Sequence, residues 1–149
     1  MQLKIINSFL FCCFFVFASN VNAFEWEYIT EMQDRKHFVD TGSINEHSGF
    51  RWAYYKSEYP KVQTGSDYNT KKNYSYTSAV TYMAFNCAEK TLVPLSTNYL
   101  AEDGKVEHKI RYSSEKAIIE GDKTWELDNN PETFRAPVIE FVCKQKIPK

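Results

Sequence analysis

The chain has 149 residues, and its 18 Lys and Arg against 19 Asp and Glu give a formal net charge of −1. This near balance argues against a nucleic-acid-binding protein and against a protein held on an anionic membrane by charge. Aromatic residues make up 16% of the chain, which favours sheet over helix.

The N-terminal segment has the three parts of a secretory signal. Lys4 gives a basic start, residues 5–18 form an almost unbroken apolar run, and Val21-Asn22-Ala23 offers small residues at the positions that a signal peptidase reads. A run of about 14 residues is shorter than the roughly 20 that a membrane-spanning helix needs. We therefore predict a cleaved signal at residues 1–23, no stable membrane span and a single mature domain at residues 24–149, with a retained anchor as the alternative.

The four cysteines divide two and two between the signal and the mature domain. Cys12 and Cys13 leave with the signal, and the bulky Phe11 before Cys12 is not typical of a lipoprotein signal. We therefore predict an exported protein, periplasmic or associated with the cell surface, that is not a lipoprotein. Cys87 and Cys143 are expected to pair in an oxidising compartment, with a metal–thiolate pair or a catalytic thiol as the alternatives.

Alternation of apolar and polar residues predicts strands along most of the mature domain. The segment Ser78–Glu89 is apolar on both faces, as is typical of a central strand, and Asp103-Gly104 supplies a hairpin turn. In chain order, the predicted strands are residues 24–28, residues 36–44, a strand that opens at Gly49, residues 78–89, and a hairpin of residues 93–99 and 105–112.

The stretch Pro60–Thr77 is polar and is predicted to be irregular. A segment of about 18 such residues is long enough to indicate function or disorder. Its interleaved tyrosines and lysines have the ingredients of a recognition surface for a protein or a carbohydrate, and the alternative is an ordinary mobile loop with packed tyrosines at its roots. The candidate binding residues are Tyr59, Tyr68, Lys71, Lys72 and Tyr74.

The residue pattern in the C-terminal part of the chain predicts a helix. Asn130 is a possible cap with Pro131 in the first turn. Pro137 is tolerable only if the regular helix begins near residues 133–134, so that no interior hydrogen bond is lost. The apolar residues at helical spacing are Phe134, Val138, Ile139 and Val142.

Catalytic and metal-binding motifs are absent from the sequence. There is no glycine-rich phosphate loop, no G-x-S-x-G elbow and no H-E-x-x-H or cysteine cluster. His37 and His47 are expected to face solvent, and His108 is expected to be partly buried and hydrogen-bonded. Alternation puts His37 and Asp40 on opposite faces, so we interpret Asp40 and Ser43 as turn residues rather than as members of a triad. We predict a non-enzymatic protein with no cofactor and no metal site.

The order of these features resembles the surface-adhesin protein E family of bacterial exported domains. The matching features are Trp26, the run Phe38-Val39-Asp40-Thr41-Gly42-Ser43-Ile44, Arg51-Trp52-Ala53-Tyr54, Asn86-Cys87, Asp103-Gly104, Trp125, Asn130-Pro131 and Val142-Cys143. The resemblance implies an α+β fold in which an antiparallel sheet of about six strands packs against a C-terminal α-helix, with Cys87 bonded to Cys143.

The resemblance also implies adhesion to host extracellular-matrix proteins. Our leading hypothesis is an exported binding domain that engages a protein partner through loops and exposed aromatic residues. The second hypothesis is a periplasmic carrier or sensor of a small ligand, with an aromatic pocket between sheet and helix near Trp52 and Trp125. An enzyme of unrecognised type is the third.

Overall fold

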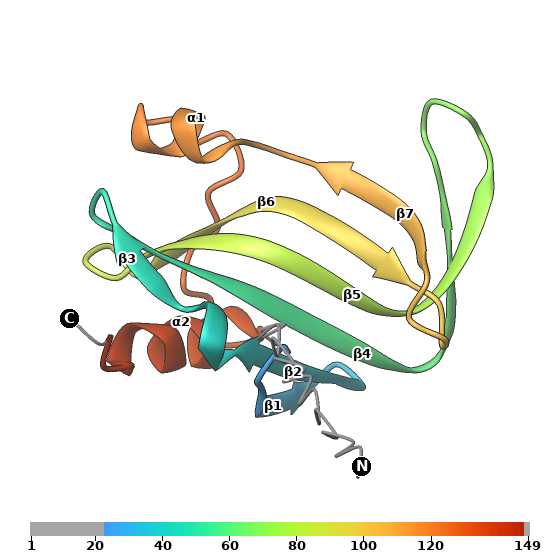
Figure 1. The fold of residues 1–149 in the computed structure, drawn as a ribbon, viewed down its shortest axis with the longest axis horizontal. Coiled ribbons are helices and arrows are strands. Elements are labelled where there is room, and N and C mark those ends of the chain that lie inside the picture. The colour runs from blue at the N-terminus through green and yellow to red at the C-terminus, as the bar shows by residue number, and fades with distance from the viewer. Residues whose placement is uncertain (1–22, 148–149) are drawn as a thin grey trace, which may run out of the picture.

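The computed structural model describes residues 23–147, which form one antiparallel sheet with two helices (Figure 1). The strand order is β1-β2-β4-β5-β6-β7, and β3 pairs with β4 off this path. The predicted α+β fold is confirmed, with seven strands rather than about six. Residues 1–22 of the predicted signal, which include Cys12 and Cys13, lie outside the described residues. The elements are β1 (Trp26–Met32), β2 (Arg35–Asp40), the 3-10 helix η1 (Thr41–Ser43), β3 (Asn45–His47), β4 (Phe50–Ser66), β5 (Asn73–Asn86), β6 (Thr91–Leu100), β7 (Val106–Arg111), α1 (Glu115–Ile119) and α2 (Arg135–Lys144).

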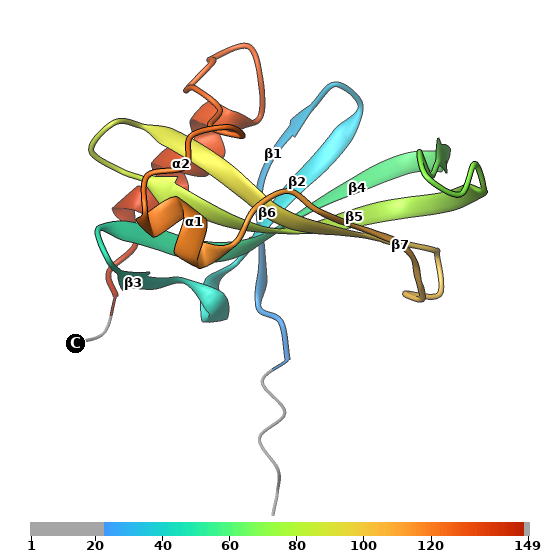
Figure 2. The ribbon, with the colours of Figure 1, turned by 90° about the horizontal axis from the view of Figure 1, so that it is seen from above.

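Helix α2 covers one face of the sheet, which we call the α2 face. Its three buried side chains, Val138, Ile139 and Val142, pack in a cluster to which β4, β5 and β6 contribute. Figure 2 shows α2 and the β1–β2 hairpin rising on the same side of the sheet. The predicted disulfide between Cys87 and Cys143 is confirmed, with an S–S distance of 2.04 Å.

The C-terminal end of α2 is also held by a charge-assisted contact. The Arg51 guanidinium, on β4, donates from Nη1 to the carbonyl oxygens of Val142 at 2.6 Å and Gln145 at 2.9 Å. These carbonyls are at the negative end of the helix, where they lack intrahelical partners. The Arg51 guanidinium therefore provides hydrogen-bond donors for the carbonyl oxygens at the end of α2, which the disulfide holds close to the sheet.

The start of α2 corrects one detail of the prediction. Asn130 accepts the backbone N–H of Glu132 at 2.9 Å and, through its own carbonyl, the N–H of Thr133 at 3.1 Å. Asn130 thus caps the turn before the helix, and the regular helix begins at Arg135. Pro137 then occupies the first turn, where its missing N–H removes no helical hydrogen bond.

The opposite face, which we call the α1 face, is covered in part by α1, a short helix that the sequence did not lead us to predict. The Ser114 hydroxyl accepts the backbone N–H of Ala117 at 3.2 Å, which is the arrangement of a helix N-cap. Ile118 of α1 is buried against Trp52, which is itself fully buried. Since α1 has only five residues, it covers one end of this face.

The stretch predicted to be irregular, Pro60–Thr77, is mostly strand. Strands β4 and β5 continue through a register shift between Glu58 and Gln63 and end at a tip formed by residues 67–72. Figure 1 shows this end of the hairpin turned up beside β7. The prediction was wrong because the outer part of the β4–β5 hairpin is held by main-chain hydrogen bonds. Its sequence lacks the regular apolar alternation from which strands are predicted.

The histidines divide between buried and exposed positions. His37 is only 1% exposed, so its expected solvent position was wrong. Its ring stacks on Tyr55 and on Phe134, the residue just before α2, at centroid distances of 5.8 Å and 5.0 Å. His47 is exposed as predicted. Asp40 accepts the backbone N–H of Gly42 at 3.2 Å, which confirms its role in the turn.

Candidate functional site

Beyond α1, the α1 face carries a row of aromatic side chains from the first strands. We call this set the aromatic patch: Phe24, Trp26, Tyr28, Phe38, Tyr54 and Lys56. The ring of Phe24 stacks on Trp26 at 5.1 Å and meets Tyr54 edge-on at 5.6 Å. Phe24 and Tyr28 are 55% and 53% exposed. The patch is continuous with the buried cluster under α1, because Tyr54 also contacts Tyr82 at 4.9 Å.

A lysine lies at the centre of the patch. The Lys56 ammonium is 4.9 Å from the Trp26 ring and 4.6 Å from the Phe38 ring, within cation–π range. It also donates to Glu58 at 2.7 Å. Only 17% of the Lys56 side chain is exposed, so its charge is neutralised within the patch and its stem fills the space between the rings. The patch therefore presents aromatic surface rather than net charge.

Sequence reasoning missed the patch as a site, although the signal was present. Phe24, Trp26 and Tyr28, which lead into β1, alternate with Glu25 and Glu27, and this alternation predicts one aromatic face. That face was interpreted as part of the fold, since a single strand does not show whether a helix covers it.

The second candidate surface is the tip of the β4–β5 hairpin, residues 67–72. Asp67 organises it, since one carboxylate oxygen accepts the backbone N–H groups of Asn69 at 2.8 Å and Thr70 at 2.6 Å. The backbone hydrogen bond from Thr70 holds the pKa of Asp67 below its usual value. Tyr68 is 84% exposed, with the Lys71 ammonium 4.1 Å from its ring.

A tyrosine cluster supports the hairpin where it leaves the sheet. The ring of Tyr76 is 5.3 Å from Tyr59 and 4.8 Å from Tyr99, and Tyr74 stacks on His108 at 4.3 Å. Burial raises the pKa of Tyr74, Tyr76 and Tyr99 above the ordinary value of a tyrosine. The tip also contacts β7, since the His108 Nδ1 atom lies 3.6 Å from a carboxylate oxygen of Asp67.

The predicted binding residues thus fall into two groups. Tyr59 and Tyr74 lie at the base of the hairpin, joined through Tyr76, with intermediate exposure. The structure brings the other three together at the exposed tip or directly beside it: Tyr68, Lys71 and Lys72.

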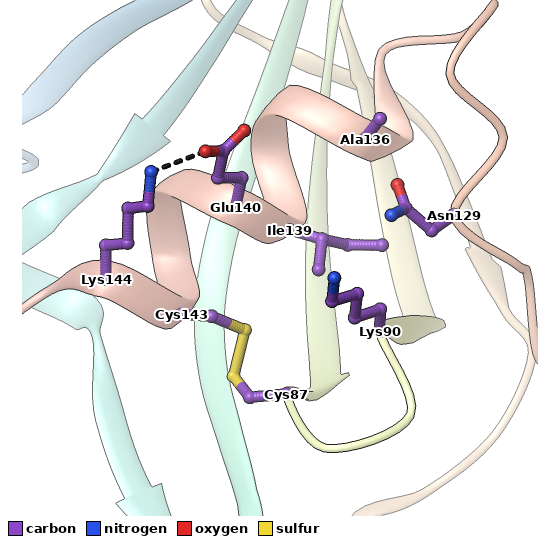
Figure 3. Close-up of a pocket in the computed structure, with 8 residues that line it drawn as sticks. All are labelled: Cys87, Lys90, Asn129, Ala136, Ile139, Glu140, Cys143 and Lys144. Atoms are coloured by element: carbon purple, nitrogen blue, oxygen red, sulfur yellow. Dashed lines mark hydrogen bonds and ion pairs between the residues drawn. A yellow bond between two sulfur atoms is a disulfide. The ribbon is translucent and has the colours of Figure 1, made fainter.

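A cavity of about 380 Å³ lies beside the disulfide, between α2 and the β5–β6 turn (Figure 3). Ile139 and Ala136 line its apolar part, and Lys90 and Asn129 line the opposite wall. Lys144 is paired with Glu140 and lowers the pKa of that carboxyl. None of these residues sets a nucleophile against a base, so the cavity suggests no catalytic chemistry.

The two tryptophans named for the predicted aromatic pocket lie in different surroundings. Trp52 is fully buried under α1, whereas Trp125 is 46% exposed and packs edge-on against Tyr112. Within residues 23–147, no three His, Cys, Asp or Glu side chains gather as metal ligands would. Over the same residues, no helix has the length and apolar character of a membrane span.

Comparison with known proteins gives a family and a fold. A family model described as surface-adhesin protein E matches residues 26–144. The structure of Haemophilus influenzae protein E matches with a TM-score of 0.50 and 16% identity, covering 79% of this chain and 83% of that one. A crystal structure of protein E from non-typeable Haemophilus influenzae matches with a TM-score of 0.45 and 16% identity, covering 78% and 74%. The first of these structural similarities shows a shared fold alone. The search of curated proteins found no match to this chain.

Proposed function

Because the chain belongs to the surface-adhesin protein E family, we propose that it is an exported, adhesin-like protein that binds a protein partner without catalysing a reaction. The observation that carries this proposal is the aromatic patch, which lies on the sheet face opposite α2 and beyond α1. The family name supports binding as the class of activity, and the patch supplies a surface for it.

The chemistry of the patch suits a protein partner. Exposed aromatic residues that lie together mark interaction surfaces more often than scattered ones do, and Trp and Tyr anchors supply a large share of binding energy. Phe24 and Tyr28 are the accessible members, while Lys56 is already paired with Glu58. We therefore propose that contact with the partner is made mainly by aromatic packing, and that it depends only weakly on salt.

The hairpin tip, which carries three of the five binding residues predicted from the sequence, is the second proposed contact. Tyr68, Lys71 and Lys72 are exposed at the tip of the β4–β5 hairpin, and Figure 1 shows this end of the hairpin turned up away from β1 and β2. A projecting tip of this kind can reach a partner that is seated elsewhere on the protein. We propose that it adds a smaller contribution than the patch.

We propose extracellular-matrix proteins as the partner class and the cell surface as the site of action. The test is binding of the purified protein to immobilised matrix proteins, together with cell fractionation. Replacing Phe24 and Tyr28 by Ala should weaken binding by roughly 10- to 100-fold, the loss expected for removing two aromatic anchors. The matched control is Tyr68→Ala, which removes an aromatic side chain of greater exposure and should cost less.

Two results would overturn the proposal. If the double variant binds as tightly as the unaltered protein while Tyr68→Ala abolishes binding, the patch is not the main contact. If the protein stays wholly in the periplasm and binds no matrix protein, the adhesin function itself is wrong. Thermal unfolding of each variant shows whether lost binding reflects lost folding.

A further inference from the structure

A polar cleft of about 740 Å³ lies between the β1–β2 turn and the point where β4 bends. Gln33, Asp34 and Arg35 line it from the turn, and Tyr59, Gln63 and Tyr76 line it from the hairpin. Its volume lies within the roughly 300–1,000 Å³ of ligand pockets. It is at the opposite end of the β1–β2 hairpin from Phe24 and Trp26, so it is separate from the surface proposed to bind protein.

Both walls of the cleft are built by local backbone geometry. Gln33 and Asp34 have φ values of 54° and 57°, the left-handed pair of a two-residue hairpin turn. On the other wall, the register shift in β4 between Glu58 and Gln63 turns Tyr59 toward Tyr76. The hairpin turn and the strand pairing therefore fix the backbone on both sides of the cleft before any ligand arrives.

The aromatic wall is rigid and set at a corner. The rings of Tyr59 and Tyr76 meet at 88° with centroids 5.3 Å apart, and Tyr76 is backed by Tyr99 at 4.8 Å. The Arg35 guanidinium lies 5.3 Å from the Tyr59 ring centroid. Two tyrosine side chains and a guanidinium thus line the same cleft, an arrangement that can recognise shape as well as charge.

The polar wall offers both donors and acceptors. Arg35 donates from Nη2 to the Gln33 side-chain oxygen at 3.0 Å, which orients both groups along the turn. Glu31 and Asp34 supply acceptors, and Arg35 and Lys61 supply donors, so the four charges lining the cleft cancel. None of these four side chains forms an ion pair within the described part of the chain.

From this combination we propose that the cleft binds a neutral oligosaccharide. The C–H groups on one face of a pyranose ring pack on aromatic rings, and its hydroxyl groups need donors and acceptors close together, both of which this cleft provides. A polyanionic glycan would need an excess of cations, which the balanced charges do not give. A lipid would need a mainly apolar lining, whereas the lining of this cleft includes charged and amide side chains.

The test is a titration of the isotope-labelled exported protein with neutral oligosaccharides, followed by NMR of the backbone amides. The probes are lactose, N-acetyllactosamine, maltotriose, mannotriose and chitotriose at millimolar concentrations. At least one of them should shift amide signals of residues 31–35 and 58–63. Tyr59→Ala and Asp34→Gly should each weaken that binding by roughly tenfold or more, a change of about 1.4 kcal/mol. Glycine accepts the positive φ of Asp34, so the second variant is expected to fold even if the first does not.

The control is Tyr28→Ala, which removes an exposed aromatic side chain from the aromatic patch and should leave the saccharide titration unchanged. Asp34→Gly should conversely leave binding to the protein partner unchanged, so the two proposals fail independently. Absence of shifts with all five saccharides overturns the proposal. So does a result in which heparin or a zwitterionic dipeptide such as Gly-Gly shifts these amides and no neutral saccharide does.

Discussion

Removal of the Cys87–Cys143 disulfide is expected to lower the free energy of unfolding by about 4 kcal/mol. The bond closes a loop with a sequence separation of 56. In the chain-entropy model, the loss of freedom in the unfolded chain is about 14 cal/mol/K for a loop of this length, or about 4 kcal/mol at 25 °C. Since small domains are stable by about 5–15 kcal/mol, the bond supplies a large share of the margin.

The folded state itself should survive the change. Val138, Ile139 and Val142 remain buried against the sheet, and Arg51 still binds the carbonyls at the end of α2. The suitable variant replaces both cysteines by Ala, which leaves neither a free thiol nor an unsatisfied hydroxyl. Its fluorescence spectrum should match that of the unaltered protein, because the surroundings of the tryptophans do not include the disulfide.

The assay is urea unfolding followed by tryptophan fluorescence. We expect a lower midpoint, a steeper dependence on urea because the open chain exposes more surface, and a fall in Tm of roughly 15 °C. Reductant should destabilise the unaltered protein to a similar extent and should leave the double-Ala variant unaffected. A loss below about 1 kcal/mol in the double-Ala variant would refute the reasoning, since the loop would then not constrain the unfolded chain.

Three further predictions concern single contacts. His37 is buried, which lowers its pKa below the ordinary value of about 6.5, so the unfolded chain binds protons more readily and stability should fall as pH drops below about 6.5. Equilibrium unfolding at several pH values tests this, and the pH dependence should diminish when His37 and its partner Tyr55 are both replaced by Phe. Replacing Gly65 by Ala should destabilise the hairpin by about 1–3 kcal/mol, because the added methyl group would lie 2.3 Å from the Tyr74 ring; amide exchange that is unchanged in β5 would contradict this. Arg51→Met should cost about 1–3 kcal/mol by leaving the carbonyls at the end of α2 without their donor, whereas Arg51→Lys, which keeps a charge, should cost less in the same unfolding assay.

The sequence predicted the parts of the fold that have a strong periodic pattern. The central strand at Ser78–Glu89, the hairpin at Asp103-Gly104 and the terminal helix were all found, and they correspond to β5, β6–β7 and α2. In each of them burial of one or both faces imposes a recognisable order of apolar residues. The disulfide was expected on other grounds, because two cysteines of an exported domain tend to pair and the family resemblance implied the same bond.

The parts that failed depend on distant contacts. His37 looked solvent-facing because the covering ring, Phe134, comes from a segment almost a hundred positions later. The hairpin at Pro60–Thr77 was missed because the rings that pack there, Tyr74 and Tyr76, meet Tyr99, which comes from a later strand. Of the candidate binding residues, Tyr59 was singled out for its sequence neighbourhood, but only the bend of β4 sets it against Tyr76 and forms a cleft.

The disulfide also divides the chain mechanically. Under tension applied at the two ends, force passes from Cys87 directly to Cys143, so β6, β7, α1 and nearly all of α2 form a closed ring that cannot be drawn out. The closed loop has a sequence separation of 56. At roughly 3.4 Å per residue, it therefore reduces the length of the fully extended chain by about 190 Å. Only β1 to β5 lie on the stretched path, and among them is β1, the edge strand that carries Trp26 and Tyr28. Pulling would therefore disturb the aromatic patch, whereas strands β6 and β7 inside the closed loop could not be extended.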